Sequence, residues 1–431
     1  MNLKDLPPAP EVHEHTMENG LRLVVAPVPG SELAALTMVL PGGVGDEPEG
    51  PGTTQLSHSL WLGRSAAELR ANLAEKLSKQ GSDYLMDVEY DHVRLGLVGL
   101  SRNVKPMLEF FEVVEEGRAI KQDDFEDRRM AQVDELWVLD RTASARSAQE
   151  LRRSSFSTGH PYGRAIGGDR RSLAKVNLDA MKKRLERSLC PNQAVLIAAG
   201  GLSLAGLQAL ATEHLAGWRS CPNSKPLVLP RVGGPRREVI LVEAPRRTQA
   251  LVMMSLPVDQ PDPRTQIALE VWSELLAGTL SSRLQIKLRG DSAITYGAHA
   301  WVEVDRGASR LLLQTAVEAD RLPNALEVIG RTLAETMTQP PTPEEIAQAW
   351  RRYQLERRAI ARDPESFSLL LADRIAAQQP WIELTSPTVV ELSDVATKFL
   401  GADRAHLVVV GPVSLKSNLE GAGWGAVRTV Q

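Results

Sequence analysis

The sequence predicts an α+β fold built from two homologous, duplicated domains, each a mainly antiparallel sheet packed with helices. Two observations predict it. The pattern A-x-L-x-x-x-G-x-x-S occurs at 194–203 and returns 211 residues later at 405–414. The halves also begin alike, because 23–27 reads LVVAP and 241–245 reads LVEAP, and each leads into a β-rich run that ends in Leu-Pro. A repeat of such long period indicates two domains, each with its own core.

The length of the chain supports this division. With 431 residues, the chain is too long for one ordinary hydrophobic core. The stretch 227–235 reads LVLPRVGGP, which has the composition of a linker. We therefore expect a first domain at 1–225, a linker at 226–236 and a second domain at 237–431.

Each half is expected to follow one order of elements: a β-hairpin, a helix, further strands, long helices and a closing strand. In the first half, a Pro-Gly turn separates the two strands of the hairpin. In the second half, the run PPTPEE at 340–345 predicts the start of a helix. The expected elements are the strands Leu21–Val28, Leu33–Leu40, Tyr84–Tyr90, Val93–Val98, Ala194–Ala199 and His406–Val410, and the helices Asp124–Leu139, 315–336 and 343–362.

Composition excludes several functional classes. The net charge of −4 and pI near 6.1 give no electrostatic basis for nucleic-acid binding. No apolar run is long enough to span a bilayer, and the first residues do not read as a secretion signal. Cys190 and Cys221 lack metal-ligand spacing and do not make a disulfide framework, which indicates a reducing compartment. We expect a cytoplasmic protein, with a periplasmic protein whose signal was trimmed as the alternative.

The helix predicted at Gly52–Trp61 carries an incomplete metal motif. Its frame is similar to the zinc motif H-x-x-E-H, but Thr54 stands at the first histidine and Ser57 at the glutamate, so that only His58 remains. Residues 54 and 58 share one helix face. A hydrolytic zinc site needs three protein ligands and a general base, and Thr54 and Ser57 supply neither. We expect no metal in this chain and no peptide cleavage by the chain alone.

Six features along the chain follow an order found in one protein family. They are an opening strand at 19–25, the helix at 54–58 followed by Gly63, the carboxylate Glu135, the turn His160–Arg164, the strand at 192–203 and the segment Ser282–Tyr296. In this order they resemble the pitrilysin family of zinc metallopeptidases, which includes insulin-degrading enzyme and mitochondrial processing peptidase. The resemblance covers nearly the whole chain. Glu135 follows His58 by 77 residues, which is the spacing of the family's third zinc ligand.

The resemblance implies a role for Arg289 and Tyr296. They match the family's paired arginine and tyrosine, which hold the substrate backbone and polarise the scissile carbonyl. Both side chains are hydrogen-bond donors and suit that task. A chain with a degenerate metal motif and an intact arginine–tyrosine pair resembles the second chain of bacterial two-chain peptidases, whose first chain carries the zinc motif.

The resemblance thus implies a homologous partner with an intact H-x-x-E-H motif and the zinc, acting on a peptide substrate. A homodimer in isolation is the alternative state. In this chain the strand Tyr84–Tyr90 has Leu85-Met86 where the family's peptide-docking edge has Asn-Ala, which argues against docking there.

Two other interpretations stay open. In one, the chain is a protease-fold scaffold or peptide-binding subunit with no proteolytic role. In the other, it is a residual hydrolase that uses His58, Glu135 and an unforeseen ligand. On the plain interpretation of these two residues, His58 is a hydrogen-bonded histidine at a former site and Glu135 is an ordinary helix carboxylate.

Overall fold

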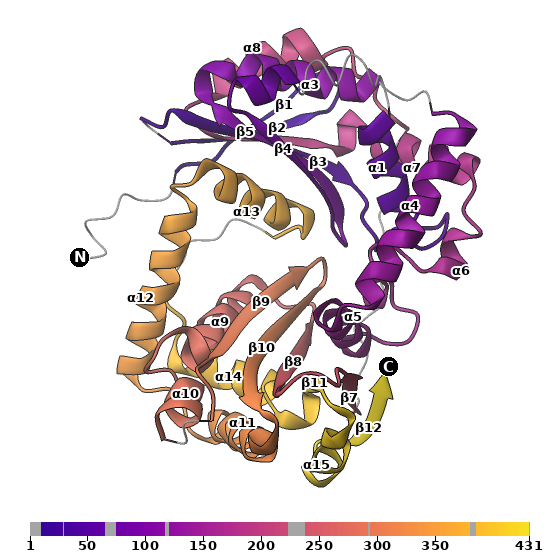
Figure 1. Ribbon diagram of the computed structural model, residues 1–431. Coiled ribbons are helices and arrows are strands. Elements are labelled where there is room, and N and C mark those ends of the chain that lie inside the picture. Colours follow the sequence, from indigo (N-terminus) through magenta and orange to yellow (C-terminus); the bar gives the residue numbers. More distant parts are fainter. Residues whose placement is uncertain are drawn as a thin grey trace. The chain divides into compact units, whose positions relative to one another are not determined.

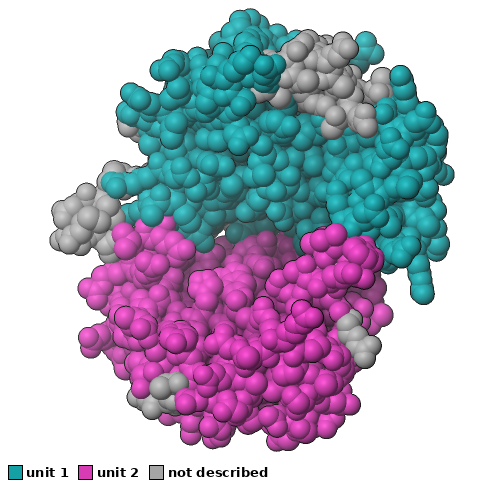
Figure 2. Space-filling view, in the orientation of Figure 1, with its two compact units in different colours: residues 1–136, 165–228, 357–379 teal, residues 137–164, 229–356, 380–431 magenta. Residues whose placement is uncertain are grey.

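The computed structural model describes residues 10–28, 30–64, 75–116, 120–222, 238–291, 294–379 and 385–430 (Figure 1). The chain forms two compact units (Figure 2). Unit 1 comprises residues 1–136, 165–228 and 357–379, and unit 2 comprises residues 137–164, 229–356 and 380–431. Each unit holds one six-stranded sheet packed with helices, which confirms the predicted α+β class and the two homologous domains. The expected linker at 226–236 lies outside the described residues.

The sheet of unit 1 has the strand order β1-β2-β6-β3-β5-β4. Its closing strand β6 pairs parallel with β2 and antiparallel with β3. At the end of β6 the backbone of Gly200 lies so close to the backbone of Leu33 that a side chain would not fit. A Cβ on Gly200 would lie 2.2 Å from the carbonyl oxygen of Leu33. The strands are β1 (His13–Thr16), β2 (Arg22–Pro27), β3 (Leu33–Pro41), β4 (Asp83–Val88), β5 (His92–Leu100) and β6 (Val195–Gly200).

The predicted hairpin between the first two strands of the first half is wrong. Both strands form, as β2 and β3, but β6 lies between them and they do not pair with each other. The reason lies in the composition of β6. All six of its residues are buried, so both faces of the strand are covered, and such a strand is most stable in the middle of a sheet.

Helices cover the sheet of unit 1. Phe367, Leu371 and Ala372 of α13 pack on one face, against alternate residues of β2, β3 and β6. A buried hydrogen bond of 2.9 Å between the hydroxyls of Thr37 and Ser368 joins α13 to β3. The helices are α1 (Thr53–Arg64), α3 (Val104–Glu116), α4 (Gln122–Asp140), α6 (Arg170–Leu173), α7 (Leu178–Ser188), α8 (Leu204–Leu215) and α13 (Pro364–Ala376).

The sheet of unit 2 repeats this plan with the order β12-β7-β11-β8-β10-β9. Its closing strand β11 again lies inside, parallel to β7 and antiparallel to β8. The predicted helix at 315–336 begins too early, because residues 315–318 belong to β10 and pair with β8. The strands are β7 (Glu238–Glu243), β8 (Gln249–Asp259), β9 (Ala298–Asp305), β10 (Ala308–Glu318), β11 (His406–Gly411) and β12 (Ala426–Val430).

The larger core of unit 2 lies between its sheet and α9, α11 and α14. The other face of the sheet packs against Leu151 of α5. Two π-helical turns, η5 and η6, follow α9. The helices are α5 (Ala143–Ser155), α9 (Pro263–Ser273), η5 (Glu274–Gly278), α10 (Arg283–Gln285), η6 (Ile286–Asp291), α11 (Leu322–Thr338), α12 (Pro343–Ile360), α14 (Val389–Phe399) and α15 (Lys416–Gly421).

Each half of the sequence contributes one helix to the unit formed by the other half. By sequence α5 belongs to the first half, yet it is part of unit 2, and α13 of the second half is part of unit 1. The boundaries at 1–225 and 237–431 stay a prediction, which assigned α5 and α13 by sequence order alone. We call α5 and α13 the exchanged helices.

Candidate functional site

Helix α1 brings the three degenerate motif positions to a buried face. Thr54, Ser57 and His58 all have a solvent exposure of 0%. The start of the helix is held by Glu47, whose carboxylate accepts the backbone N–H groups of Gly52 at 3.0 Å and Thr54 at 2.8 Å. Burial raises the pKa of Glu47 to about 7, although these two bonds favour the charged carboxylate.

His58 is a neutral histidine with one nitrogen bonded inside its own helix. Its Nδ1 lies 2.9 Å from the carbonyl oxygen of Thr54 and 3.1 Å from the hydroxyl of Ser57. Since a carbonyl only accepts, the proton sits on Nδ1 and the lone pair on Nε2. No hydrogen-bond partner for Nε2 occurs among the described residues. Burial, followed by the charge of Arg184, lowers the pKa of His58 to about 3.

A buried arginine adds positive charge to the same region. Arg184 of α7 has an exposure of 1% and donates to the carbonyl oxygens of Asp46, at 3.1 Å, and Gly42. Its nearest carboxylate is 3.9 Å away, on Asp46. Burial lowers the pKa of Arg184 to about 10, so it remains a cation at neutral pH. A second cation beside it would be repelled in this low-dielectric interior.

Glu135, which the family spacing places at the third zinc ligand, lies on the exposed side of α4. Its carboxylate accepts two hydrogen bonds from Arg128, at 2.8 and 3.0 Å, and its side chain is 55% exposed. One turn earlier, Gln132 is buried and donates to the carbonyl oxygens of Gly52 at 3.1 Å and Gly167 at 2.9 Å. The α4 side chain that contacts the start of α1 is therefore the amide of Gln132. The residue spacing from His58 indicated Glu135 and did not indicate Gln132.

The donors around His58 do not fit a zinc ion. His58 offers one imidazole lone pair, Thr54 and Ser57 are hydroxyls, and Gln132 is a neutral amide that donates to backbone carbonyls. Zinc in proteins takes three or four thiolate, imidazole or carboxylate ligands. Across the described ranges, no group of three His, Cys, Asp or Glu side chains could hold a metal ion. The described residues of this region form a buried polar cluster.

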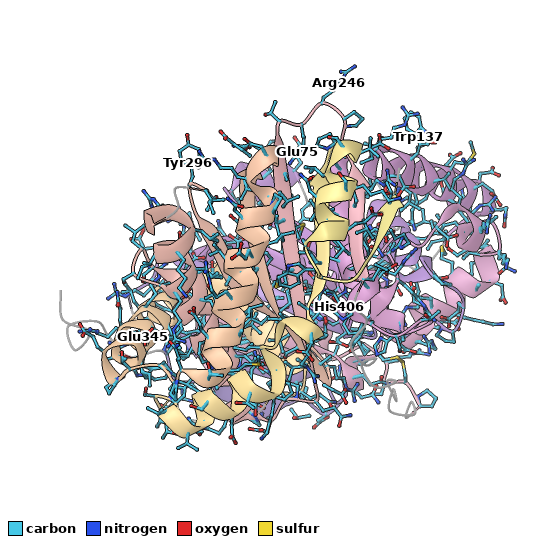
Figure 3. All side chains as sticks on the ribbon, turned by 90° about the horizontal axis from the view of Figure 1, so that it is seen from below. Glu75, Trp137, Arg246, Tyr296, Glu345 and His406 are labelled. Atoms are coloured by element: carbon cyan, nitrogen blue, oxygen red, sulfur yellow. A yellow bond between two sulfur atoms is a disulfide. The ribbon has the colours of Figure 1, made fainter. Side chains whose placement is uncertain are left out.

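The second predicted pair lies on the surface of unit 2. Arg289 belongs to η6 and is exposed, and Tyr296 follows it in the loop before β9 with an exposure of 92%. Figure 3 shows the Tyr296 side chain pointing away from the ribbon. Neither side chain has a hydrogen bond or ion pair with another described residue. Both donors are thus available to a ligand.

Described residues on both sides of this pair are anchored. Arg283 donates to Glu345 of α12 at 2.8 Å, and Lys287 forms an ion pair with Glu335 of α11. Behind Tyr296, the hydroxyl of Thr295 donates to the carbonyl oxygen of Ala316 at 2.7 Å. Exposed donors on an anchored segment are pre-organised for binding.

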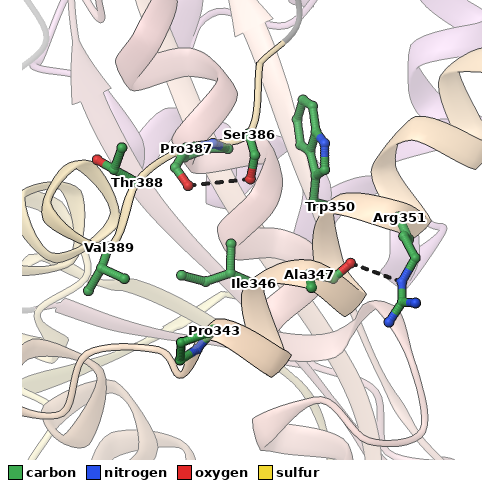
Figure 4. A pocket seen from close by; sticks show the side chains of 9 residues that line it. All are labelled: Pro343, Ile346, Ala347, Trp350, Arg351, Ser386, Pro387, Thr388 and Val389. Atoms are coloured by element: carbon green, nitrogen blue, oxygen red, sulfur yellow. Dashed lines mark hydrogen bonds between the residues drawn. The ribbon is translucent and has the colours of Figure 1, made fainter.

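A separate hollow of about 490 Å³ lies between the start of α12 and the residues that lead into α14 (Figure 4). Its lining is mostly apolar, and Trp350 in its wall stacks on Tyr353 with ring centroids 5.3 Å apart. None of the predicted site residues lines it. Its lining residues are Pro343, Ile346, Ala347, Trp350, Arg351, Ser386, Pro387, Thr388 and Val389.

The expectation for the two cysteines is wrong. Cys190 and Cys221 form a disulfide with their Cα atoms 5.4 Å apart. The amide of Asn192 reinforces this closure, because it donates to the carbonyl of Cys221 at 3.0 Å and accepts its N–H at 3.1 Å. Folding brings the cysteines together across 31 residues, which spacing alone did not reveal. No helix in the described part of the chain has the length and apolar character needed to cross a bilayer.

Known proteins are similar to this chain in sequence and in fold. The family described as "Peptidase M16 inactive domain" matches residues 175–353. An uncharacterized zinc protease of Mycobacterium tuberculosis is 24% identical over 328 residues, 74% of this chain and 73% of its own length.

Two solved structures have the same fold. A peptidase M16 inactive domain from Pseudomonas fluorescens has a TM-score of 0.75 at 19% identity and covers 93% of this chain and 98% of its own. A chain of Complex III2 from Candida albicans has a TM-score of 0.77 at 11% identity, and the match covers 95% of this chain and 97% of that one. Residues 175–353 therefore match the M16 peptidase family, and the chain, in which Thr54 and Ser57 replace two residues of the zinc motif, fits a degenerate-motif member of the pitrilysin-type (M16) metallopeptidases.

Proposed function

We propose that this chain is the non-catalytic subunit of a two-chain zinc metalloendopeptidase. A homologous partner with an intact H-x-x-E-H motif binds the zinc and supplies the general base. This chain supplies Arg289 and Tyr296, which bind the peptide backbone and polarise the carbonyl to be attacked. One contrast among the described residues carries the proposal: the His58 region is buried and offers one imidazole but no set of zinc ligands, whereas Arg289 and Tyr296 are exposed and have no side-chain partner there.

The chemistry of the pair suits this role. A guanidinium and a phenol both donate hydrogen bonds, and a tetrahedral intermediate develops negative charge on the former carbonyl oxygen. Donors that are already in place when this charge forms lower the barrier, and losing one of them costs about 100- to 1000-fold in kcat. The water-activating steps belong to the partner, because the described residues around His58 provide no metal ligand set.

The test is co-expression with a homologous chain from the same host that carries the intact motif. We expect a stable complex that cleaves peptides, whereas each chain alone does not. In the complex, Arg289→Ala and Tyr296→Phe should lower kcat by about 100-fold or more while the complex still forms. Arg246→Ala, at an exposed arginine in the β7–β8 turn of the same unit, is the matched control and should leave kcat unchanged.

A second candidate function is a protease-fold scaffold without a role in hydrolysis. The closed His58 region supports it, and a chain of Complex III2 has the same fold. The same complex distinguishes the two functions. If it forms and Arg289→Ala and Tyr296→Phe leave peptide cleavage unchanged, the scaffold function replaces the proposed one. Stoichiometric zinc together with peptidase activity in the isolated chain would instead support the residual hydrolase.

The Cys190–Cys221 disulfide bears on where the protein matures. Disulfides form and persist in oxidising compartments and are rare in the reducing cytosol. We therefore favour an oxidising compartment such as the periplasm over the cytoplasm. Alkylation of free thiols in protein taken directly from its host, followed by mass measurement, tests this. If both cysteines of the folded protein are alkylated, the disulfide is absent in the host, and a cytoplasmic location is favoured instead.

A further inference from the structure

The apolar hollow of unit 2 lies along one face of α12. The residues that this helix contributes recur at the spacing i, i+3, i+4, i+7 and i+8, which defines a single helix face. They are Pro343, Ile346, Ala347, Trp350 and Arg351. The opposite wall is the run 386–389, which leads into α14 (Figure 4). The volume of about 490 Å³ falls within the range of about 300–1,000 Å³ that is usual for small-molecule sites.

The walls of the hollow are already ordered. Ile346 has an exposure of 8% and belongs to the larger core of unit 2, and Trp350 packs against that core. The indole of Trp350 also stacks on Tyr353, which is buried. The opposite wall is held by Arg264, which donates to the carbonyl oxygen of Thr385 at 3.1 Å. A ligand that enters this hollow therefore loses little of its binding energy to ordering the protein.

Most polar groups of the lining are used within the protein. The hydroxyl of Ser386 donates to the carbonyl oxygen of Pro387 at 3.4 Å. The hydroxyl and the N–H of Thr388 donate to Glu391 at 2.9 and 2.7 Å. Pro343 and Pro387 have no N–H to offer. The described lining therefore leaves few backbone groups that a polypeptide could pair with, and it suits a small molecule better.

Two donors in the lining remain free. The guanidinium of Arg351 donates through Nε to the carbonyl oxygen of Ala347 at 3.2 Å, and its two terminal nitrogens have no partner among the described residues. The indole N–H of Trp350 has no partner there either. No carboxylate belongs to the lining, so the charge of Arg351 is not neutralised inside the hollow. The two terminal nitrogens of a guanidinium match the two oxygens of a carboxylate.

We propose that this hollow binds an amphipathic monocarboxylate, a small molecule with one carboxylate and an alkyl or aryl body. The carboxylate accepts hydrogen bonds from the terminal nitrogens of Arg351. The apolar body lies against Ile346, Trp350 and Val389. This inference goes beyond the proposed function, because neither residue of the proposed catalytic pair lines the hollow. Binding needs no partner chain and can be measured on this chain alone.

Calorimetric titration of the full chain with 2-naphthoate tests the proposal. The matched control ligand is 2-naphthylmethanol, which has the same rings and no charge. We expect 2-naphthoate to bind about fivefold more tightly, because its ion pair with Arg351 is exposed to solvent and contributes modestly. Added salt should weaken the binding of 2-naphthoate and leave that of 2-naphthylmethanol unchanged. Equal affinities for the two ligands, or no binding of 2-naphthoate, overturn the proposal.

A matched pair of variants locates the ligand. Val389→Asp and Val390→Asp place the same carboxylate on neighbouring residues in the first turn of α14, where an acidic side chain is tolerated. Val389 lines the hollow and Val390 does not, although Val390 is the more exposed, at 72% against 38%. Val389→Asp should weaken binding of 2-naphthoate about tenfold, because it removes apolar contact and repels the ligand. Val390→Asp should leave binding nearly unchanged, and equal binding by the two variants overturns the proposal.

A substitution of Arg351 tests the charged contact. Arg351→Gln should weaken binding of 2-naphthoate about fivefold and leave binding of 2-naphthylmethanol unchanged. Arg246→Gln, at an exposed arginine of unit 2 outside the hollow, is the control and should alter neither affinity. An Arg351→Gln variant that still prefers 2-naphthoate by the same factor contradicts the proposal. If Val389→Asp does not fold, this comparison decides, because the Arg351 side chain is exposed.

Discussion

Nδ1 of His58 lies 2.9 Å from the carbonyl oxygen of Thr54, the residue that stands where the zinc motif has its first histidine. The one imidazole left in the motif therefore donates a hydrogen bond from Nδ1 within its own helix. Its Nε2 is buried without a hydrogen-bond partner among the described residues, and the charge of Arg184 lowers the pKa of the same imidazole. The misfit to zinc thus extends beyond the two substituted positions, because the hydrogen bonds and the positive charge around His58 also disfavour a bound cation.

Restoring a zinc site should depend on Gln132 and not on Glu135. Gln132 contacts the start of α1 through Gly52, whereas Glu135 is paired with Arg128 on the exposed side of α4. Thr54→His with Gln132→Glu should bind one zinc per chain in a competition titration with a chromogenic chelator, because three ligands then meet. Thr54→His alone, which still has Glu135, should not. Equal zinc binding by both variants would show that Glu135 reaches the site.

Acid should destabilise unit 1 through His58. Its pKa is about 3 in the folded chain against an ordinary 6.5, so below pH 6.5 the unfolded chain takes up a proton that the folded chain does not. Stability is retained above pH 6.5 and falls as pH drops toward 3. When the pH is lowered from 7 to 5, the free energy of unfolding of the unmodified chain should fall. For the His58→Gln variant this fall should be smaller by about 2 kcal/mol.

Urea unfolding at the two pH values measures this difference. His299→Gln, the same substitution at an exposed position of unit 2, is the control. A His58→Gln variant with the same loss between pH 7 and 5 as the unmodified chain contradicts the prediction.

The disulfide should contribute measurably to stability. It closes a loop between residues 31 apart, and loops of that size give about 3–4 kcal/mol in the chain-entropy description. Cys190→Ser with Cys221→Ser should lower the free energy of unfolding by about this amount, measured in urea. Reductant should lower the unmodified chain to the level of the variant and leave the variant unchanged. A variant as stable as the oxidised chain would show that the bond adds nothing.

The elements that the sequence predicted correctly are those with a local or repeated signal. The closing strands were found because the same pattern occurs twice, and their apolar runs allow little else. The α1 helix was found because a Gly/Pro-rich loop precedes an amphipathic stretch. The exposure of Arg289 and Tyr296 also agrees with the role inferred from the family pattern, although the role itself stays a prediction.

The features that sequence reasoning missed depend on long-range contacts. The apolar composition of β6 favours a place inside a sheet, but it does not show that the neighbours are β2 and β3, since that depends on which strands accept an apolar partner on both sides. Arg184 reaches the His58 region from α7, far along the chain, and no spacing rule anticipates it. Glu135, found by counting residues, lies on the exposed side of α4 as a plain helix carboxylate would, and Gln132, three residues earlier, occupies the buried side.

The exchanged helices should couple each half of the sequence to the sheet of the other half. Leu371 of α13 is fully buried against β2, β3 and β6, and Leu151 of α5 is buried against β7, β10 and β11. Replacing either leucine by alanine removes buried methyl groups and leaves a cavity, which costs about 2–5 kcal/mol. Leu371→Ala should therefore speed hydrogen exchange in β2 and β6 of unit 1, although residue 371 lies in the second half of the sequence. Leu151→Ala should do the same for β7 and β11 of unit 2. Faster exchange confined to the sheet of the mutated residue's own half would show that α5 and α13 do not stabilise the sheets on which they pack.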